Sequence, residues 1–132
     1  MKNKEQQFQQ GEVTFVNKLS DFLKTDDLVG LRSFLKIHPE VTPENYKEEV
    51  LLLVESFFIK HLQHPDEEDG LDKLHEVLNL SFCSLDEIKK DKKIVSALLQ
   101  ALEDLRKEQN NNAIGRIENL GILEKDVIRK AA

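Results

Sequence analysis

The chain has 132 residues, the length of one ordinary domain, of which 39% are hydrophobic and 33% charged. Its net charge of −6 disfavours general binding to nucleic acids and electrostatic docking to anionic membranes, because an acidic surface repels phosphate groups. The single cysteine, Cys83, excludes an internal disulfide.

The N-terminus lacks the apolar core that a signal peptide needs. The longest apolar stretch, at 50–59, is too short to span a bilayer, which takes about 20 residues. The simplest expectation is a cytoplasmic protein.

The first part of the chain predicts a leader and two helices. Residues 1–11 are polar and rich in Gln, so we expect a flexible leader before a single helical domain at 12–132. The apolar residues of 12–24 fall on one helical face. Thr25-Asp26-Asp27 supplies capping oxygens for a second helix, which His38-Pro39 should end. Gly30 lies inside this helix, which indicates close packing of another helix there.

The third predicted helix should be the centre of the domain. It begins at Thr42-Pro43-Glu44, where a hydroxyl, a proline and an acid form a strong start signal, and runs to about Gln63. One broad face is mostly apolar, and Leu52 and Ile59 lie nearly opposite it. A helix with apolar residues on two sides usually has neighbours on both.

The rest of the chain also predicts helices. An acidic turn at 64–70 precedes a fourth helix, and the capping-box pattern Ser84-Leu85-Asp86-Glu87 begins another that extends to about Glu108. The charged block at 89–93 could break it, and residues 110–112 form a predicted loop. Two short helices follow at 113–120 and 123–130, divided by Gly121. The sequence therefore predicts an all-α fold: an antiparallel multi-helix bundle or a short stack of helix pairs, with about six to seven helices.

The most suggestive candidate site is a histidine cluster. His61, His64 and His75, with Asp72, offer side chains that bind transition metals, but their spacing matches no established metal framework. His61 lies near a helix C-terminus and His64 in a turn, so ordinary structural roles are favoured. We keep a helical metal-binding protein as an alternative function.

The sequence contains no assembled catalytic chemistry. The five glycines are dispersed and form no phosphate-binding loop. Glu55 interrupts the apolar run of the central helix, and its helical angle favours a partly exposed position over a buried general acid. Cys83 has no partner that would make it a nucleophile, so a small buried apolar role is favoured. We expect no enzyme and no cofactor.

These observations favour a non-enzymatic helical interaction module, such as an adaptor, chaperone-like factor, inhibitor or subunit. A groove beside Leu52, Glu55 and Ile59 is the predicted docking site. The expected partner is another protein or a second copy of the chain. The negative charge of the chain would suit a partner with a basic surface. A further alternative is a fragment of a larger helical repeat protein.

Overall fold

The computed structural model describes residues 15–39, 47–80 and 82–130, and all regular secondary structure in those ranges is α-helical. The helices in chain order are a segment at 15–24, α2 (Leu28–Ile37), α3 (Lys47–Leu62), α4 (Glu68–Leu78), α5 (Leu85–Lys90), α6 (Lys92–Lys107), α7 (Asn111–Asn119) and α8 (Lys125–Lys130). The predicted all-α fold class is confirmed. The predicted leader and the start signal at 42–44 lie outside the described residues.

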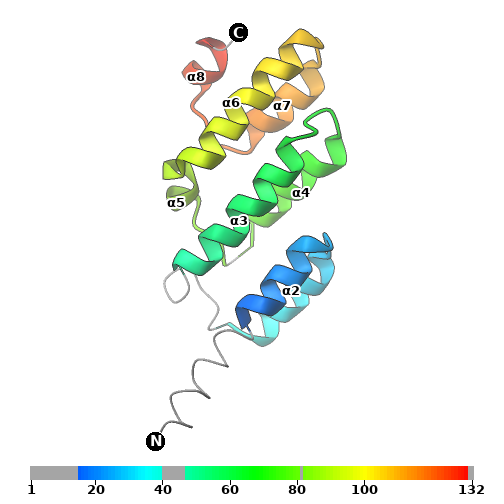
Figure 1. The fold of residues 1–132 in the computed structure, drawn as a ribbon, viewed down its shortest axis with the longest axis vertical. Coiled ribbons are helices and arrows are strands. Elements are labelled where there is room, and N and C mark those ends of the chain that lie inside the picture. The colour runs from blue at the N-terminus through cyan, green and yellow to red at the C-terminus, as the bar shows by residue number, and fades with distance from the viewer. Residues whose placement is uncertain (1–14, 40–46, 81, 131–132) are drawn as a thin grey trace, which may run out of the picture.

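The helices form antiparallel pairs that stack along the long axis of the molecule (Figure 1). The segment 15–24 pairs with α2, where the rings of Phe22 and Phe34 have centroids 5.7 Å apart. Helix α3 pairs with α4, and α6 pairs with α7. Between pairs, α3 packs on α6, while α4 packs on both α2 and α7. The arrangement is therefore a short stack of helix pairs with two layers, and we call the layer of α2, α4 and α7 the second-helix face.

Several predicted boundaries are confirmed by cap geometry. The Asp27 carboxylate accepts a hydrogen bond from the Gly30 N–H at 2.9 Å, and α2 ends one residue before His38. The charged block at 89–93 does break a helix. Asp91 ends α5 and caps α6, accepting from the Ile94 N–H at 3.0 Å. Gly121 has a φ of +73° after α7, the left-handed conformation that favours glycine at a helix end.

Three local predictions need correction. Helix α4 begins at Glu68, inside the predicted acidic turn, because acidic side chains in a first turn stabilise the helix N-terminus. Ser84 does precede α5, but its side chain makes no capping hydrogen bond. The predicted loop at 110–112 is shorter, since Asn110 caps α7 through the Ala113 N–H at 3.1 Å and the next two residues are helical.

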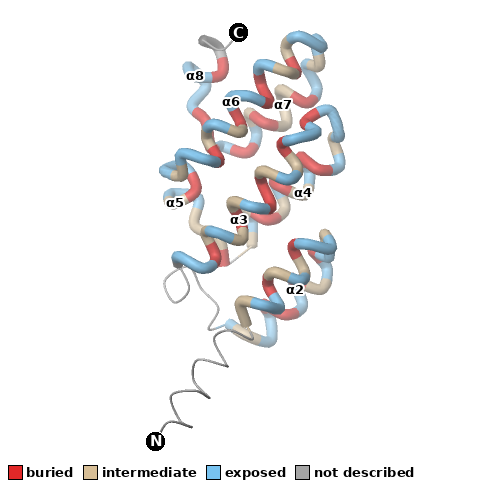
Figure 2. Tube along the Cα trace, in the orientation of Figure 1, coloured by how far each residue is buried: buried red, intermediate tan, exposed pale blue. Residues whose placement is uncertain are grey.

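The core lies between the two layers, and the buried positions follow the faces that neighbouring helices turn toward one another (Figure 2). In α3, Val54 and Phe58 are fully enclosed, as expected for the predicted central helix. Burying each such side chain contributes about 1.5–3 kcal/mol. None of the polar or charged residues in the described ranges is buried. Among the described residues, every helix is too short or too polar to span a bilayer.

Candidate functional site

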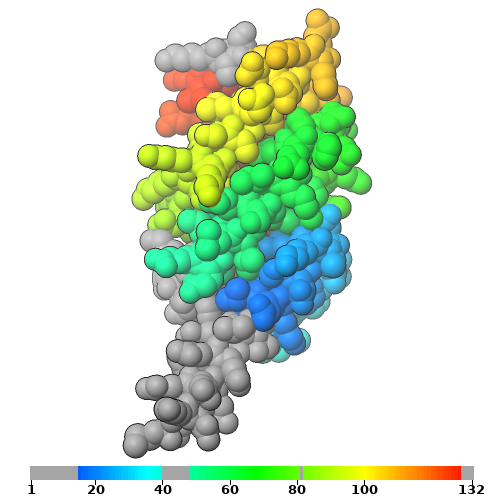
Figure 3. All heavy atoms as spheres, in the orientation of Figure 1, coloured from blue at the N-terminus to red at the C-terminus, as the bar shows by residue number. Residues whose placement is uncertain are grey.

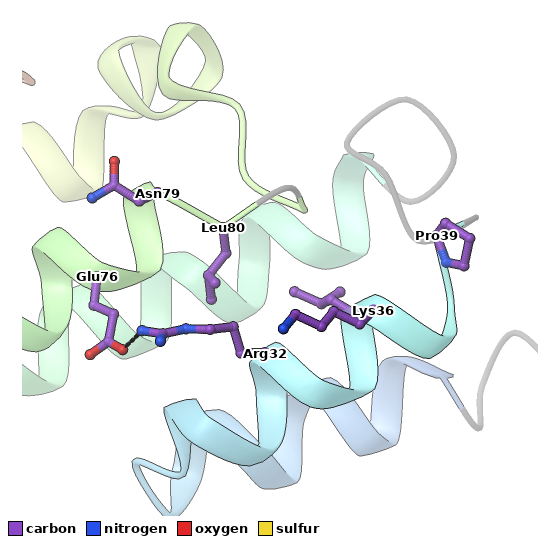
Figure 4. Close-up of a pocket in the computed structure, with 7 residues that line it drawn as sticks. Arg32, Lys36, Pro39, Glu76, Asn79 and Leu80 are labelled. Atoms are coloured by element: carbon purple, nitrogen blue, oxygen red, sulfur yellow. Dashed lines mark hydrogen bonds and ion pairs between the residues drawn. The ribbon is translucent and has the colours of Figure 1, made fainter.

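A groove between α2 and α4 has a volume of about 570 Å³ and is larger than three other cavities in the described part of the chain (Figure 4). We call it the α2–α4 groove. The other cavities enclose about 20 to 160 Å³. Only the α2–α4 groove falls within the range of about 300–1,000 Å³ that is typical of ligand sites. Its lining residues are Arg32, Leu35, Lys36, Pro39, Glu76, Asn79 and Leu80.

Helical spacing places the polar side chains of the groove on its outer edges. Arg32 and Lys36 are four residues apart on the exposed side of α2, while Leu35 turns into the core at 7% exposure. Glu76 lies in the last turn of α4, and Asn79, three residues later, is the C-cap of that helix. The groove is thus apolar at its base, with charges and an amide along its rim.

The charges of the groove are unequal. The Arg32 guanidinium reaches across from α2 and forms an ion pair with the Glu76 carboxylate on α4 (Figure 4). Lys36 forms no ion pair with any residue in the described ranges. The groove therefore carries one excess positive charge on a chain whose net charge is −6.

A second, smaller cavity of about 160 Å³ opens between α4 and α7. Asp72 and His75 line it from α4, and Arg116 from α7. The Arg116 side chain lies 3.6 Å from carboxylate oxygens of both Glu68 and Asp72. One stripe runs along α4 to its C-cap and contains residues 72, 75, 76 and 79. Because residues of this stripe line both cavities, the smaller cavity and the α2–α4 groove both open on the second-helix face.

The predicted docking residues lie on the opposite layer, where 15–24, α3 and α6 follow one another (Figure 3). Leu52 is 62% exposed, whereas Glu55 and Ile59 are half-buried. The three residues line none of the four cavities. Leu52 is therefore the only member of this stripe that offers a large exposed apolar surface.

Glu55 faces the junction of α5 and α6. Its carboxylate lies 3.6 Å from the Lys93 ammonium. Burial raises the pKa of Glu55, and the neighbouring Asp91 carboxyl raises it further against the smaller opposing effect of Lys93. Glu55 thus takes part in contacts between helices within the chain.

The candidate metal ligands have separate partners. His61 Nε2 lies 3.0 Å from Asp26 Oδ1, His64 is exposed, and His75 neighbours Asn79. Asp72 lies beside Arg116. Within the described ranges, no three His, Cys, Asp or Glu side chains come together in a group that could hold a metal ion.

Cys83 lies against the core, beside a cavity of about 20 Å³. Burial raises the pKa of its thiol to about 12. A thiol with so high a pKa stays protonated at neutral pH and is a poor nucleophile.

Sequence reasoning missed a charge cluster centred on Asp26. The turn before α2 holds Asp26 in the left-handed region, at a φ of 56°. Its carboxylate lies 2.8 Å from the Lys60 ammonium, 3.0 Å from His61 Nε2 and 3.6 Å from the Lys73 ammonium. Burial acts to raise the pKa of Asp26, but hydrogen bonds with Lys60 and His61 outweigh burial and lower it. The cluster joins the first helix pair to α3 and α4.

The chain matches no family model, no curated protein and no solved structure.

Proposed function

We propose that the chain is a non-enzymatic helical module that binds another protein, in the manner of an adaptor, chaperone-like factor, inhibitor or subunit. The α2–α4 groove is the observation that carries this proposal. It has the volume of a binding site, an apolar base and a polar rim. Grooves between packed helices are a common place for a partner segment to dock.

The second-helix face extends this surface beyond a single cavity. The polar stripe of α4 separates the α2–α4 groove from the cavity beside α7. A segment lying across the face could contact both cavities, which favours a partner larger than a small metabolite.

Capture from the source lysate tests the proposal. The purified chain is immobilised, and bound proteins are identified by mass spectrometry at low and high salt. One dominant partner in comparable amount, confirmed by mixing the two purified proteins, is the expected result. Loss at high salt would assign the contact to charged groups. Recovery of no partner at either salt concentration would contradict the proposal.

A variant of the opposite layer separates the two candidate surfaces. Leu52→Asp places a charge at the exposed position of α3 without disturbing the core. If the partner binds in the α2–α4 groove, this variant should bind as tightly as the wild type. Loss of binding with a normal thermal melt would move the interface to the layer that contains Leu52.

A further inference from the structure

We infer that the α2–α4 groove takes an acidic and apolar peptide segment of the partner protein. The inference rests on the proposed function. When the segment is bound, one of its carboxylates pairs with the Lys36 ammonium, and a neighbouring apolar side chain of the segment packs on Leu35 and Leu80.

The charges of the groove favour a carboxylate. Lys36 is exposed at the rim and has no ion-pair partner in the described ranges, so it can bind an acid without breaking an existing contact. Arg32 lies one turn away, and its side chain is 52% exposed even though it pairs with Glu76. An incoming carboxylate can therefore interact with two cations. A basic segment would face the same two cations with only Glu76 to attract it.

The apolar base of the groove favours an apolar side chain next to the acidic residue of the bound segment. Leu35 is nearly enclosed and Leu80 is half-buried, and both line the cavity together with the ring of Pro39. Covering Leu80 and the ring of Pro39 removes apolar surface from water, whereas the nearly enclosed Leu35 adds little. A bare anion such as phosphate would gain nothing from this part of the groove.

The two parts of the groove together favour a peptide over a small carboxylate. A peptide can place an acid at Lys36 and an apolar side chain on Leu80 at the same time, and a small acid has no group for the second contact.

Peptide binding to the full chain tests the inference. A short fluorescein-labelled peptide that alternates Glu and Leu is titrated with the protein, and binding is read by fluorescence anisotropy. A second peptide has Lys in place of each Glu, and free acetate is added as a small competing carboxylate. We expect the Glu peptide to bind, the Lys peptide to bind at least about tenfold more weakly, and acetate not to displace the Glu peptide.

Lys36→Glu is the deciding variant, with Lys90→Glu as its matched control. Both lysines are exposed, lie in the last turn of a helix and form no ion pair in the described ranges, so the two substitutions change the charge equally. Lys36→Glu should weaken binding of the Glu peptide by about tenfold or more, and Lys90→Glu should not. Equal effects of the two variants, or stronger binding of the Lys peptide, would overturn the inference.

The same variants separate this inference from the proposed function. If a partner captured from lysate binds wild type and Lys36→Glu equally, the chain is an interaction module but the groove does not select an acid. If no partner is captured, the proposed function fails first. Binding of acetate alone, without the peptide, would assign the groove to small carboxylates and also overturn the inference.

Discussion

At the scale of single residues, Asp26 is the carboxylate that lies beside three basic side chains from two other helices. We predict that Asp26→Asn destabilises the chain by about 1–2 kcal/mol, because the cations of Lys60 and Lys73 and the His61 ring lose their shared carboxylate. Asparagine tolerates the left-handed φ of 56° as well as aspartate does, so the substitution isolates the charge. Chemical denaturation at neutral pH measures the difference.

The same contact makes a prediction about pH. A carboxyl group whose pKa is lower in the folded state contributes stability above its unfolded pKa of about 4 and loses it as the pH falls through the folded value. The stability difference between wild type and Asp26→Asn should therefore shrink as the pH falls below about 4. A difference that stayed the same size below about pH 3 would contradict this description of the cluster.

Two glycines should respond in opposite directions to alanine. A Cβ at Gly30 would lie 2.4 Å from Asp27 Oδ2 and 2.8 Å from a ring carbon of Phe22, so Gly30→Ala must displace the cap of α2 or the packed ring. We expect a loss of about 1–3 kcal/mol. Gly115, inside α7, has open space around its Cβ position, and Gly115→Ala should stabilise by about 0.5–1 kcal/mol. Thermal melts of both variants check the signs.

The sequence predicts the surroundings of some of these residues but not of others. The pattern indicated close packing at Gly30, and the structure shows Phe22 of the neighbouring helix there. It also favoured a partly exposed Glu55 and a small apolar role for Cys83. It could not reveal that Asp26, Lys60 and Lys73 meet, since these residues are far apart in the chain and no local pattern records the contact.

At the scale of helices, capping bonds distinguish two start signals that look alike in sequence. Asp27 bonds to the Gly30 N–H, whereas the Ser84 side chain forms no such bond. Asp27→Ala should therefore lower the free energy of unfolding by about 1 kcal/mol, and Ser84→Ala should leave it almost unchanged. Equal losses in the two variants, measured by urea unfolding, would show that these caps do not set the stability of their helices.

Glu55 connects α3 to the junction of α5 and α6, and its charge should oppose folding at neutral pH. Because its pKa is raised in the folded state, the stability that it contributes is present below the unfolded pKa of about 4 and is lost as the pH rises through the folded value. Glu55→Gln should therefore be more stable than wild type at pH 7, and this advantage should disappear below about pH 4. Lower stability of Glu55→Gln at pH 7 would mean that the Lys93 contact outweighs the burial of Glu55 and the repulsion by Asp91.

Helix boundaries could be predicted where a breaking residue marks them, as at His38-Pro39, Asp91 and Gly121. The predicted boundaries were wrong where the polar residues are common both in turns and in the first turn of a helix. The acidic residues of 66–69 and the asparagines of 110–112 are examples, because a first helical turn favours the same side chains that a loop does.

At the scale of the whole molecule, the apolar stripes specified which faces are buried but not which helices meet. That is why the sequence left a bundle and a stack of helix pairs open. The α2–α4 groove was missed for the same reason. Its rim is formed by Arg32 and Glu76, which are 44 residues apart in the chain and become neighbours only when the second pair stacks on the first. The predicted stripe at Leu52 rested on the helical pattern alone.

If a partner protein binds the α2–α4 groove, backbone amides beside the groove should be protected from hydrogen exchange in the complex. Amide exchange is measured by mass spectrometry for the full chain alone and with its captured partner. The account predicts slower exchange in the residues that flank the groove, at 32–39 and 76–80, with little change in α6. Protection confined to the layer of α3 and α6, around Leu52, would contradict it.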